Sequence, residues 1–311
     1  MNVPFWCHTA ADVLPVEGPD GLDFLNRMST AELAHLPCGQ ARATVFTTEK
    51  GRIRTVAFVF HREPGQLEIL CPEGAGEELV RWLRRFCFME RLRFRALQRW
   101  SGAEVHGSGA HALVERLGLP RLNGTTWGAG TATVWEGIPV RCFRIPSYAT
   151  GEAYRLLLPE EAADTLRKAL SSALGEPAPP EQVGAARILS GIGAPGAEWS
   201  EEYNPFEVGL AELVSLTKGC YIGQEVLARL DTYGKVQRCL VRLHSSEPIP
   251  APAPLYAGEQ QIGTVTSSAY AAALQRWVAL AVVRRQWAEE ARFVAELPTG
   301  RVVLQRYMAE E

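Results

Sequence analysis

The residues best suited to chemistry stand together in the stretch TKGCYIGQE, residues 217–225. Its glycines suit a tight loop, because glycine tolerates positive φ and a close approach of the backbone. Cys220 lies near Lys218 and just before GQEVLARL, which has the pattern of a helix start. A nearby ammonium and the positive end of a helix dipole both lower the pKa of a thiol and favour the nucleophilic thiolate. Cys220 is therefore a candidate nucleophile, although composition alone favours a small buried cysteine in a tight loop.

Lysine is scarce in this chain, which has four lysines against 28 arginines. Two of the four, Lys218 and Lys235, lie between residues 216 and 238. Since cationic positions elsewhere are nearly always arginine, a compact ammonium at these two sites indicates a specific requirement.

Two carboxylates stand in motifs that suit ligand binding. Glu152, in YATGEAYRL, follows a glycine at the start of a predicted strand. A carboxylate there can accept two parallel N–H bonds from a 2-amino-4-oxo heterocycle, as it does from arginine. Glu207, in NPFEVGL, follows Pro205 shortly before the glycine loop. Spacing alone favours plainer roles, a turn glutamate for Glu152 and a helix N-terminal glutamate for Glu207.

Apolar spacing and turn residues predict two α+β units of the split βαβ type, which would position these residues. In the first unit we expect a helix capped by Asp20, strands at 41–48, 52–60 and 66–71, a helix at 76–89 and a strand at 90–97. In the second we expect a strand at 103–106, a helix at 108–117, strands at 131–136, 138–145 and 153–158, and a helix at 160–174.

Proline-rich segments divide the rest of the chain at 175–182 and 245–256. A short helix is predicted at 183–189, and four strand-like runs after the second segment suit a small β-barrel, at 261–267, 277–283, 292–297 and 301–307. The expected domains are an N-terminal unit over 1–100 completed by 183–244, a second unit over 101–182 and a barrel over 245–311.

The composition is that of an ordinary globular protein, with 311 residues, 47% of them hydrophobic, and a net charge of −3. This charge gives no general argument for nucleic acid or an anionic membrane. The N-terminus has no basic region followed by an apolar core, so we expect no signal peptide and a cytoplasmic location. Seven scattered cysteines without a C-x-x-C motif predict neither a structural metal nor an iron–sulfur cluster held by this chain alone.

Arginine is dense from Arg81 to Arg99, where Glu90 is the only acid. Such a segment can bind nucleic acid or another polyanion. Few aromatic residues interleave on the same face, so we favour a solvated strand and helix surface. An RNA or protein adaptor with a weak RNA contact at this surface is the third interpretation of the chain.

The segment KGCYIGQE (218–225), with Gly234-Lys235 and Arg238 after it, resembles the signature of the YgfZ-type folate-binding proteins. These proteins are relatives of the glycine-cleavage T-protein, an aminomethyltransferase, and of a mitochondrial iron–sulfur assembly factor. Supporting similarity covers most of the chain, in FLNRMSTAEL, TGEAY (150–154), ARILSG (186–191), NPFEVGL and IGTVTS (262–267). The resemblance implies an α+β cloverleaf of two ferredoxin-like units and a small C-terminal β-barrel around a central tetrahydrofolate site.

The resemblance also implies roles for individual residues. Glu152 would hold the pterin ring of tetrahydrofolate or a one-carbon derivative, with Tyr203 and Glu207 near the folate channel. The functional loop would comprise Lys218, Cys220, Tyr221, Gln224 and Arg229, with Cys220 and Lys218 as the catalytic candidates. Because an iron–sulfur cluster needs about four ligands, Cys220 would act together with a partner, a small thiol or a folate-derived group.

Two departures from the superfamily pattern bear on activity. T-proteins carry an Asp-Asp pair on the strand after the Lys-Gly turn and use one of these aspartates in catalysis. This chain has Thr55 and Val56 at about those positions, so no carboxylate there can assist proton transfer. Glycine-cleavage aminomethyl transfer by that mechanism is therefore not expected, and any other catalysis stays an open question. Tyr233 also stands where YgfZ-type sequences usually have arginine.

The function implied by the resemblance is that of a folate-binding protein supporting assembly or repair of iron–sulfur enzymes, including tRNA-modifying ones. Its partners would be folate and the iron–sulfur assembly machinery or its client enzymes, without a membrane, and we expect a monomer. The alternative is a folate-dependent one-carbon transferase of the aminomethyl or demethylase type that uses a different base.

Overall fold

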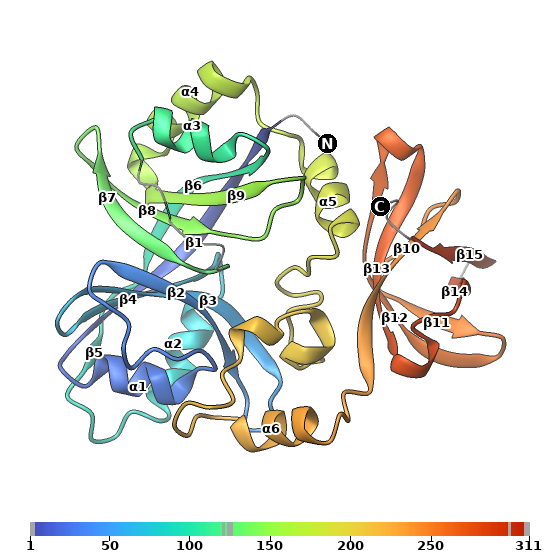
Figure 1. Cartoon of the computed structure of the whole chain (residues 1–311), viewed down its shortest axis with the longest axis horizontal. Helices are drawn as coiled ribbons and strands as arrows, with labels where there is room; N and C mark the ends of the chain where they lie inside the picture. The colour runs from blue at the N-terminus through green and yellow to red at the C-terminus, as the bar shows by residue number, and fades with distance from the viewer. Residues whose placement is uncertain (1–3, 120–121, 123–126, 298–299, 308–311) are drawn as a thin grey trace.

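The N-terminal body of the protein is built on antiparallel strands that close into a ring of eight. The computed structural model describes residues 4–119, 122, 127–297 and 300–307 (Figure 1). The strand order is β4-β3-β2-β7-β8-β9-β6-β1, and β1 pairs back with β4 to close the ring. These strands are β1 (Phe5–Glu17), β2 (Gln40–Thr47), β3 (Ile53–Glu63), β4 (Gln66–Pro72), β6 (Gln98–Gly107), β7 (Gly130–Trp135), β8 (Ile138–Arg144) and β9 (Glu152–Pro159).

Two pairs of helices divide the body into two units (Figure 1). In the first unit, α1 (Gly21–Met28) and α2 (Gly76–Arg84) bury one face against β1, β3 and β4. In the second, α3 (Ala110–Arg116) and α4 (Ala163–Leu174) pack on β6, β8 and β9. Each helix has an apolar stripe with the period of a helix, as Leu79, Trp82 and Leu83 show in α2. The predicted α+β architecture is confirmed.

The long strand β1 joins the two units, and the sequence analysis did not predict it. Residues 11–17 pair with β4 of the first unit, and residues 5–13 pair with β6 of the second. The apolar positions of β1 do not alternate strictly, since Val13, Leu14 and Val16 are all buried whereas His8 is exposed. A strand shared by two units buries different faces along its length, so the period-two signal is lost.

The arginine-rich segment after α2 departs from its prediction. The helix expected at 76–89 ends at Arg84, and the strand expected at 90–97 is only β5 (Arg93–Phe94), which pairs with β1. Side chains hold this segment instead of a strand ladder. Arg91 pairs with Asp20 at 3.0 Å and Arg95 with Glu17 at 2.6 Å, while Arg99 also pairs with an acid, Glu73. These partners come from outside the segment, so the surface is less cationic than its sequence indicated.

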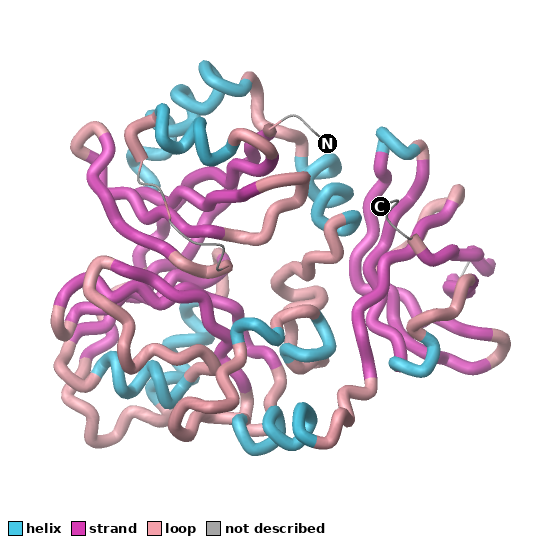
Figure 2. Tube along the Cα trace, viewed as in Figure 1, coloured by secondary structure: helices cyan, strands magenta, loops and turns pink. Residues whose placement is uncertain are grey.

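The chain leaves the body through a connecting segment of short helices and loops (Figure 2). It contains α5 (Pro180–Leu189), the short 3-10 helices η2 (Pro205–Val208) and η3 (Ala211–Leu213), and α6 (Gln224–Thr232). The TKGCYIGQE loop lies between η3 and α6. This connection brings the loop back against the first unit before the chain enters the C-terminal barrel.

The C-terminal barrel is closed, in the order β10-β13-β12-β11-β14-β15. Its strands are β10 (Arg238–Ser245), β11 (Ala253–Ala257), β12 (Gln260–Ala271), β13 (Arg276–Arg284), β14 (Arg292–Leu297) and β15 (Gly300–Arg306). Leu243, Val265, Ala281 and Phe293 fill its interior. The first barrel strand begins at Arg238, before the Pro-rich segment at 245–256. Among the described residues, no helix has the length and apolar character required to cross a membrane.

Candidate functional site

Lys218 is a buried cation bound on all sides by backbone oxygens. Its Nζ donates to the carbonyl oxygens of Asn26, Ser29 and Ala31, each at 2.6 Å. These three bonds use the three N–H groups of the ammonium. Burial lowers the pKa of Lys218 to about 8. The side chain therefore fastens the loop to the end of α1 and has no N–H group left for a ligand.

Cys220 is exposed, in contrast to the buried cysteine that composition favoured. It lies four positions before α6, which begins at Gln224 after Gly223. The ammonium of Lys218 is committed to the three carbonyls of the first unit. The structure therefore presents the Cys220 thiol to solvent and to any partner protein. Lys218, which was expected to act with this thiol, instead holds the loop against the first unit.

The other loop residues mainly hold the loop in shape. Gln224 donates from Nε2 to the carbonyl of Lys218 at 3.3 Å, and the hydroxyl of Thr47 donates to the carbonyl of Ile222 at 2.7 Å. Tyr221 is buried beneath Lys218, and its hydroxyl has no hydrogen-bond partner among the described residues. Arg229 forms an exposed i,i+4 pair with Glu225 at 3.6 Å.

Glu207 is the centre of a polar cluster that joins the body to the barrel. Asn204 and Glu207 form a capping box on η2. The carboxylate accepts from Arg238 of β10 at 2.8 Å and from Arg52 at 3.2 Å, besides the backbone N–H of Asn204 at 2.9 Å. The ring of Tyr203 lies 5.0 Å from the Arg238 guanidinium. Both oxygens of the Glu207 carboxylate are therefore already bonded to groups of the protein.

Glu152 lies at the start of β9 and is paired within its own unit. It accepts from Arg144 at 2.6 Å and from the hydroxyl of Tyr154 at 3.1 Å. Burial is the largest single influence on Glu152 and opposes its ionisation, but the hydrogen bond and charge of Arg144 and the hydrogen bond from Tyr154 together outweigh burial and lower the pKa of the carboxyl. Glu152 is not among the residues that line the central cavity described next.

A cavity of about 230 Å³ lies between the strand ring and the segment that follows α5. Its walls are aromatic and aliphatic, with Phe58 from β3 and Tyr148 from the loop before β9. The remaining lining residues that matter here are Val56, Glu73, Trp127, Ile145, Arg155, Arg187 and Trp199. None of the residues predicted for the site lines this cavity, which we call the central cavity.

Two indole groups of the central cavity lack a hydrogen-bond partner. The Nε1 atoms of Trp127 and Trp199 are buried and unpaired among the described residues. A buried N–H without an acceptor costs about 1–3 kcal/mol, so such groups need an explanation. A bound ligand with hydrogen-bond acceptors would supply the missing partners of these two indole N–H groups. Sequence reasoning missed both residues, although each tryptophan stands in a glycine-containing loop, TTWGAG and APGAEWS, where a large apolar side chain is unusual.

The charged groups of the central cavity are already paired. Arg155 donates to Glu104 at 2.8 and 2.5 Å, and Arg187 donates to the carbonyl of Ile192 at 2.7 Å. Glu73, the only carboxylate among the described lining residues, pairs with Arg99. Val56 of β3 lines the cavity and has no ionisable group. Among the described lining residues, the cavity therefore offers ring surfaces but no free carboxylate base.

A buried group behind the cavity has the side chains of a metal site, Cys7, Glu104 and His106. Internal hydrogen bonds occupy them instead. The His106 Nε2 pairs with Glu104 at 3.2 Å, and its Nδ1 accepts from the Tyr148 N–H at 3.2 Å. Burial raises the pKa of the Cys7 thiol to about 12, which keeps it protonated. We interpret the group as support for the Tyr148 loop.

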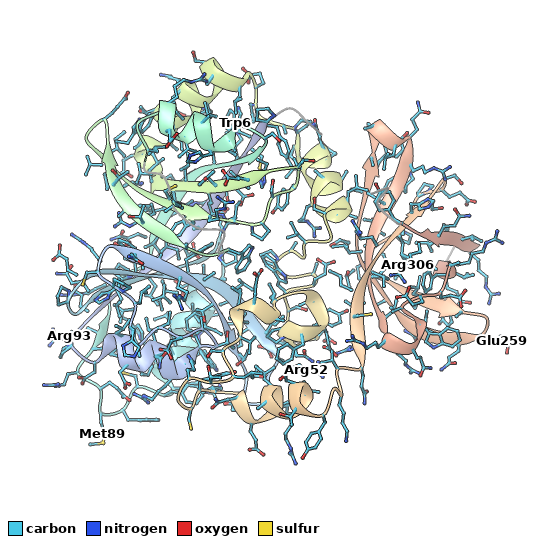
Figure 3. The ribbon with its side chains drawn as sticks, in the orientation of Figure 1. Trp6, Arg52, Met89, Arg93, Glu259 and Arg306 are labelled. Atoms are coloured by element: carbon cyan, nitrogen blue, oxygen red, sulfur yellow. The ribbon has the colours of Figure 1, made fainter. Side chains whose placement is uncertain are left out.

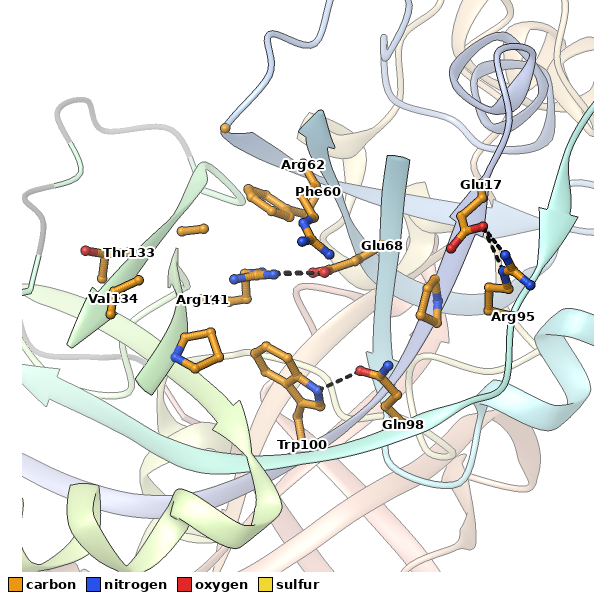
Figure 4. A pocket seen from close by; sticks show the side chains of 14 residues that line it. Glu17, Phe60, Arg62, Glu68, Arg95, Gln98, Trp100, Thr133, Val134 and Arg141 are labelled. Atoms are coloured by element: carbon orange, nitrogen blue, oxygen red, sulfur yellow. Dashed lines mark hydrogen bonds and ion pairs between the residues drawn. The ribbon is translucent and has the colours of Figure 1, made fainter. Parts of the chain in front are cut away.

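A second cavity of about 690 Å³ lies further along the same strands (Figure 4). Glu68 and Arg141 form a bidentate pair at its floor, with both N···O distances at 2.8 Å. The Arg141 guanidinium also stacks over Phe60 and Trp100, and the Trp100 indole donates to Gln98 at 3.2 Å. Unlike the central cavity, this one has no buried unpaired side-chain polar atom among its described lining residues.

Comparison with known protein families identifies the class to which this chain belongs. Residues 9–218 match the GCVT N-terminal domain, and residues 238–307 match the glycine cleavage T-protein C-terminal barrel domain. The chain therefore belongs to the glycine cleavage T-protein family. This agrees with the superfamily to which the sequence motifs pointed.

Relatives and solved structures support the same placement. A chloroplastic protein of Arabidopsis thaliana, described as a transferase, is 27% identical over 81% of this chain, and the match spans 58% of that relative. The aminomethyltransferase of Thermotoga neapolitana is 26% identical over 87% of this chain and 75% of its own length. The crystal structure of glycine cleavage system aminomethyltransferase T from Bartonella henselae superposes with a TM-score of 0.78 at 18% identity, covering 99% of this chain and 86% of that one. This last likeness establishes the fold.

Proposed function

We propose that this protein is a tetrahydrofolate-binding protein of the YgfZ type that supports assembly or repair of iron–sulfur enzymes, including tRNA-modifying ones. Membership of the T-protein family supports the folate part, because relatives are named aminomethyltransferases. The observation that carries the proposal is the central cavity, whose lining includes two tryptophans with buried indole N–H groups that have no hydrogen-bond partner among the described residues.

The central cavity fits the ring end of a folate. At about 230 Å³ it is smaller than the roughly 300–1,000 Å³ of most ligand pockets, so it suits a ring system with the remaining tail outside. Trp127 and Trp199 would donate to ring oxygen or nitrogen atoms, and Tyr148 and Phe58 would pack on its faces. Glu152 would reach a ring only after releasing Arg144. We therefore assign the ring to the tryptophans rather than to Glu152.

The lining of the central cavity favours binding over aminomethyl transfer. When bound, tetrahydrofolate would supply N5 of its ring and the neighbouring N10 as carriers of one-carbon units. Val56 cannot move a proton, and the carboxylate of Glu73 is held by Arg99. A base within hydrogen-bond reach of the reacting atom is the usual requirement for proton transfer. We propose that the protein holds its folate without glycine-cleavage chemistry.

Cys220 is the group that we propose for contact with the iron–sulfur machinery. Its thiol is exposed on a loop that Lys218 and Gln224 hold rigid. Because one thiolate supplies a single cluster ligand, a partner must supply the others. A rigid exposed thiol suits a transient bond to a sulfur species or cluster carried by that partner.

Folate binding can be tested on the two indoles. We expect Trp127→Phe and Trp199→Phe, which keep a ring but remove the N–H, each to weaken tetrahydrofolate binding about tenfold in calorimetric titration. Trp100→Phe is the control, since that indole is already bonded to Gln98 in the second cavity. Failure of the wild-type protein to bind tetrahydrofolate would remove the folate proposal.

The thiol proposal needs a cellular readout. A deletion strain carrying Cys220→Ala should show reduced activity of its iron–sulfur enzymes. The same strain carrying Cys38→Ala, which removes another exposed thiol, should regain full activity of these enzymes. Full restoration by Cys220→Ala would show that the thiol is dispensable. Methylene-tetrahydrofolate formed from an added methylamine donor would instead establish the transferase alternative.

A further inference from the structure

A second candidate binding site lies where α6, the turn after β2 and the barrel meet. It is a cavity of about 860 Å³ around the position of Arg52, which Figure 3 places between the body and the barrel. Six cationic residues line it: Lys50, Arg52, Lys235, Arg238, Arg284 and Arg285. Glu207 is the only acid among the described lining residues. We call this cavity the basic groove.

The single acid of the basic groove cannot neutralise it. Glu207 is bound by Arg52 and Arg238 and by the backbone N–H of Asn204. Within the described parts of the chain, the other four cations have no carboxylate partner, and Lys235 only stacks on the ring of Tyr233 at 5.3 Å. The groove is therefore strongly positive in a chain whose net charge is −3.

Strand register makes this concentration of charge more unusual. Arg238 of β10 and Arg284 of β13 are directly opposite each other in the antiparallel ladder. Like charges at directly opposed positions destabilise a sheet. Arg285 follows immediately, and its backbone N–H bonds to the carbonyl of Gln237 at 2.7 Å. Glu207 already pairs with Arg238, but Arg284 and Arg285 have no carboxylate partner among the described residues, so an external anion would supply the missing counter-charge.

We propose that the basic groove binds an oligoanion, a molecule with several closely spaced carboxylate or phosphate groups. Its volume exceeds what one such group needs, and amides of Gln237 and Gln286 add hydrogen-bond donors. No aromatic side chain is among the described lining residues, so the groove lacks the stacking platforms that hold the bases of single-stranded nucleic acid. Val226 and Leu230 offer an apolar strip for the chain between the charged groups. The inference does not depend on folate binding.

Calorimetric titration of the full-length, folate-free protein with inorganic triphosphate and with a pentaglutamate peptide tests the proposal. We expect at least one of them to bind, with an affinity that falls as salt rises. Arg284→Glu and Lys235→Glu should each weaken binding about tenfold to a hundredfold. Arg276→Glu is the matched control, because it reverses an exposed arginine at the other end of the same strand. The two ligands distinguish a phosphate from a carboxylate source.

Two results would overturn the inference. One is the absence of binding by both ligands at low salt. The other is equal weakening by Arg276→Glu and Arg284→Glu, which would reveal a general charge effect. Unfolding temperatures of the variants, compared with that of the wild type, separate lost binding from lost folding. Neither ligand has a pterin ring, so failure here leaves the folate proposal unaffected.

Discussion

At the scale of single residues, similar side chains take opposite roles according to their surroundings. Lys218 is buried against three carbonyls, whereas Lys235 lies in the basic groove without an acidic partner among the described residues. Both stood out in the sequence because lysine is scarce. The compact ammonium meets a structural need in the first case, because three converging N–H groups satisfy three converging carbonyls. In the second, it contributes to the proposed oligoanion site.

Replacing Lys218 tests its structural role. Lys218→Met should leave three buried carbonyls without donors and destabilise the protein by about 2–4 kcal/mol. Lys168→Met removes an exposed lysine on α4 and should stay within about 0.5 kcal/mol of the wild type. Chemical denaturation measures both. A stability change no larger for Lys218→Met than for Lys168→Met would contradict the assignment.

Glu104 gives the protein a predictable response to acid. Burial opposes its ionisation, but Arg155 and His106 outweigh it and hold the pKa of the carboxyl at about 2. The folded pKa is below the ordinary glutamate value of 4.5, so the stabilisation is complete above pH 4.5 and disappears as the pH falls towards 2. The difference in unfolding free energy between wild type and Glu104→Gln should therefore shrink across this range. A difference independent of pH would refute this account.

At the scale of elements, the TKGCYIGQE loop is held by backbone contacts to the first unit. The N–H of Ile222 bonds to the carbonyl of Arg27 at 3.1 Å, and the hydroxyl of Thr47 bonds to the carbonyl of Ile222 at 2.7 Å. Gly223 adopts φ +83 immediately before α6. These contacts fix the direction in which the loop presents Cys220.

Two glycines of the loop should respond differently to alanine. In Gly223→Ala the new Cβ would lie 2.6 Å from the Thr48 carbonyl oxygen at positive φ, so we expect a loss of about 1–3 kcal/mol. Gly219→Ala meets no atom within 4 Å and should be nearly neutral. Thermal unfolding compares the two directly. Equal melting temperatures would mean that the loop adjusts freely, which would count against rigid presentation of Cys220.

At the scale of the whole molecule, a closed strand ring and a closed barrel are joined by a connecting segment. Glu207 links the two, since it accepts from Arg52 of the body and Arg238 of the barrel. The central cavity is formed by the ring and this segment together. Both proposed binding sites therefore depend on how the segment after α5 is positioned.

Removing Glu207 should loosen the barrel from the body. Glu207→Ala removes the carboxylate partner of two partly buried guanidinium groups, so we expect a loss of about 1–3 kcal/mol and faster hydrogen exchange in the barrel. Glu296→Ala breaks an exposed pair with Arg301 and should cost less than about 1 kcal/mol. Hydrogen exchange of β10 and β13 provides the measurement. Unchanged protection of β10 in Glu207→Ala would show that other contacts suffice.

Much of the fold was predictable because its signals are local. The helices with apolar stripes and the strands at 41–48, 52–60, 131–136 and 138–145 were predicted from spacing and turn residues. The long strand β1 was missed, since pairing with strands from both units hides its alternation. Arg91 and Arg95 gave a false strand signal, because alternation with apolar residues does not reveal that acids elsewhere hold them.

The sequence by itself determined the family, the α+β class and the absence of an acid at Val56, because these depend on residue identity and short-range pattern. Tertiary structure alone decided which side chains meet. It bonds Lys218 to three carbonyls and Glu152 to Arg144. It also brings together in one cavity two distant tryptophans whose indole N–H groups have no partner among the described residues, and it places six cations around one acid in the basic groove. The physical reason is that a polar group's role depends on whether its hydrogen bonds and charge are satisfied by neighbours, and those neighbours come from far along the chain.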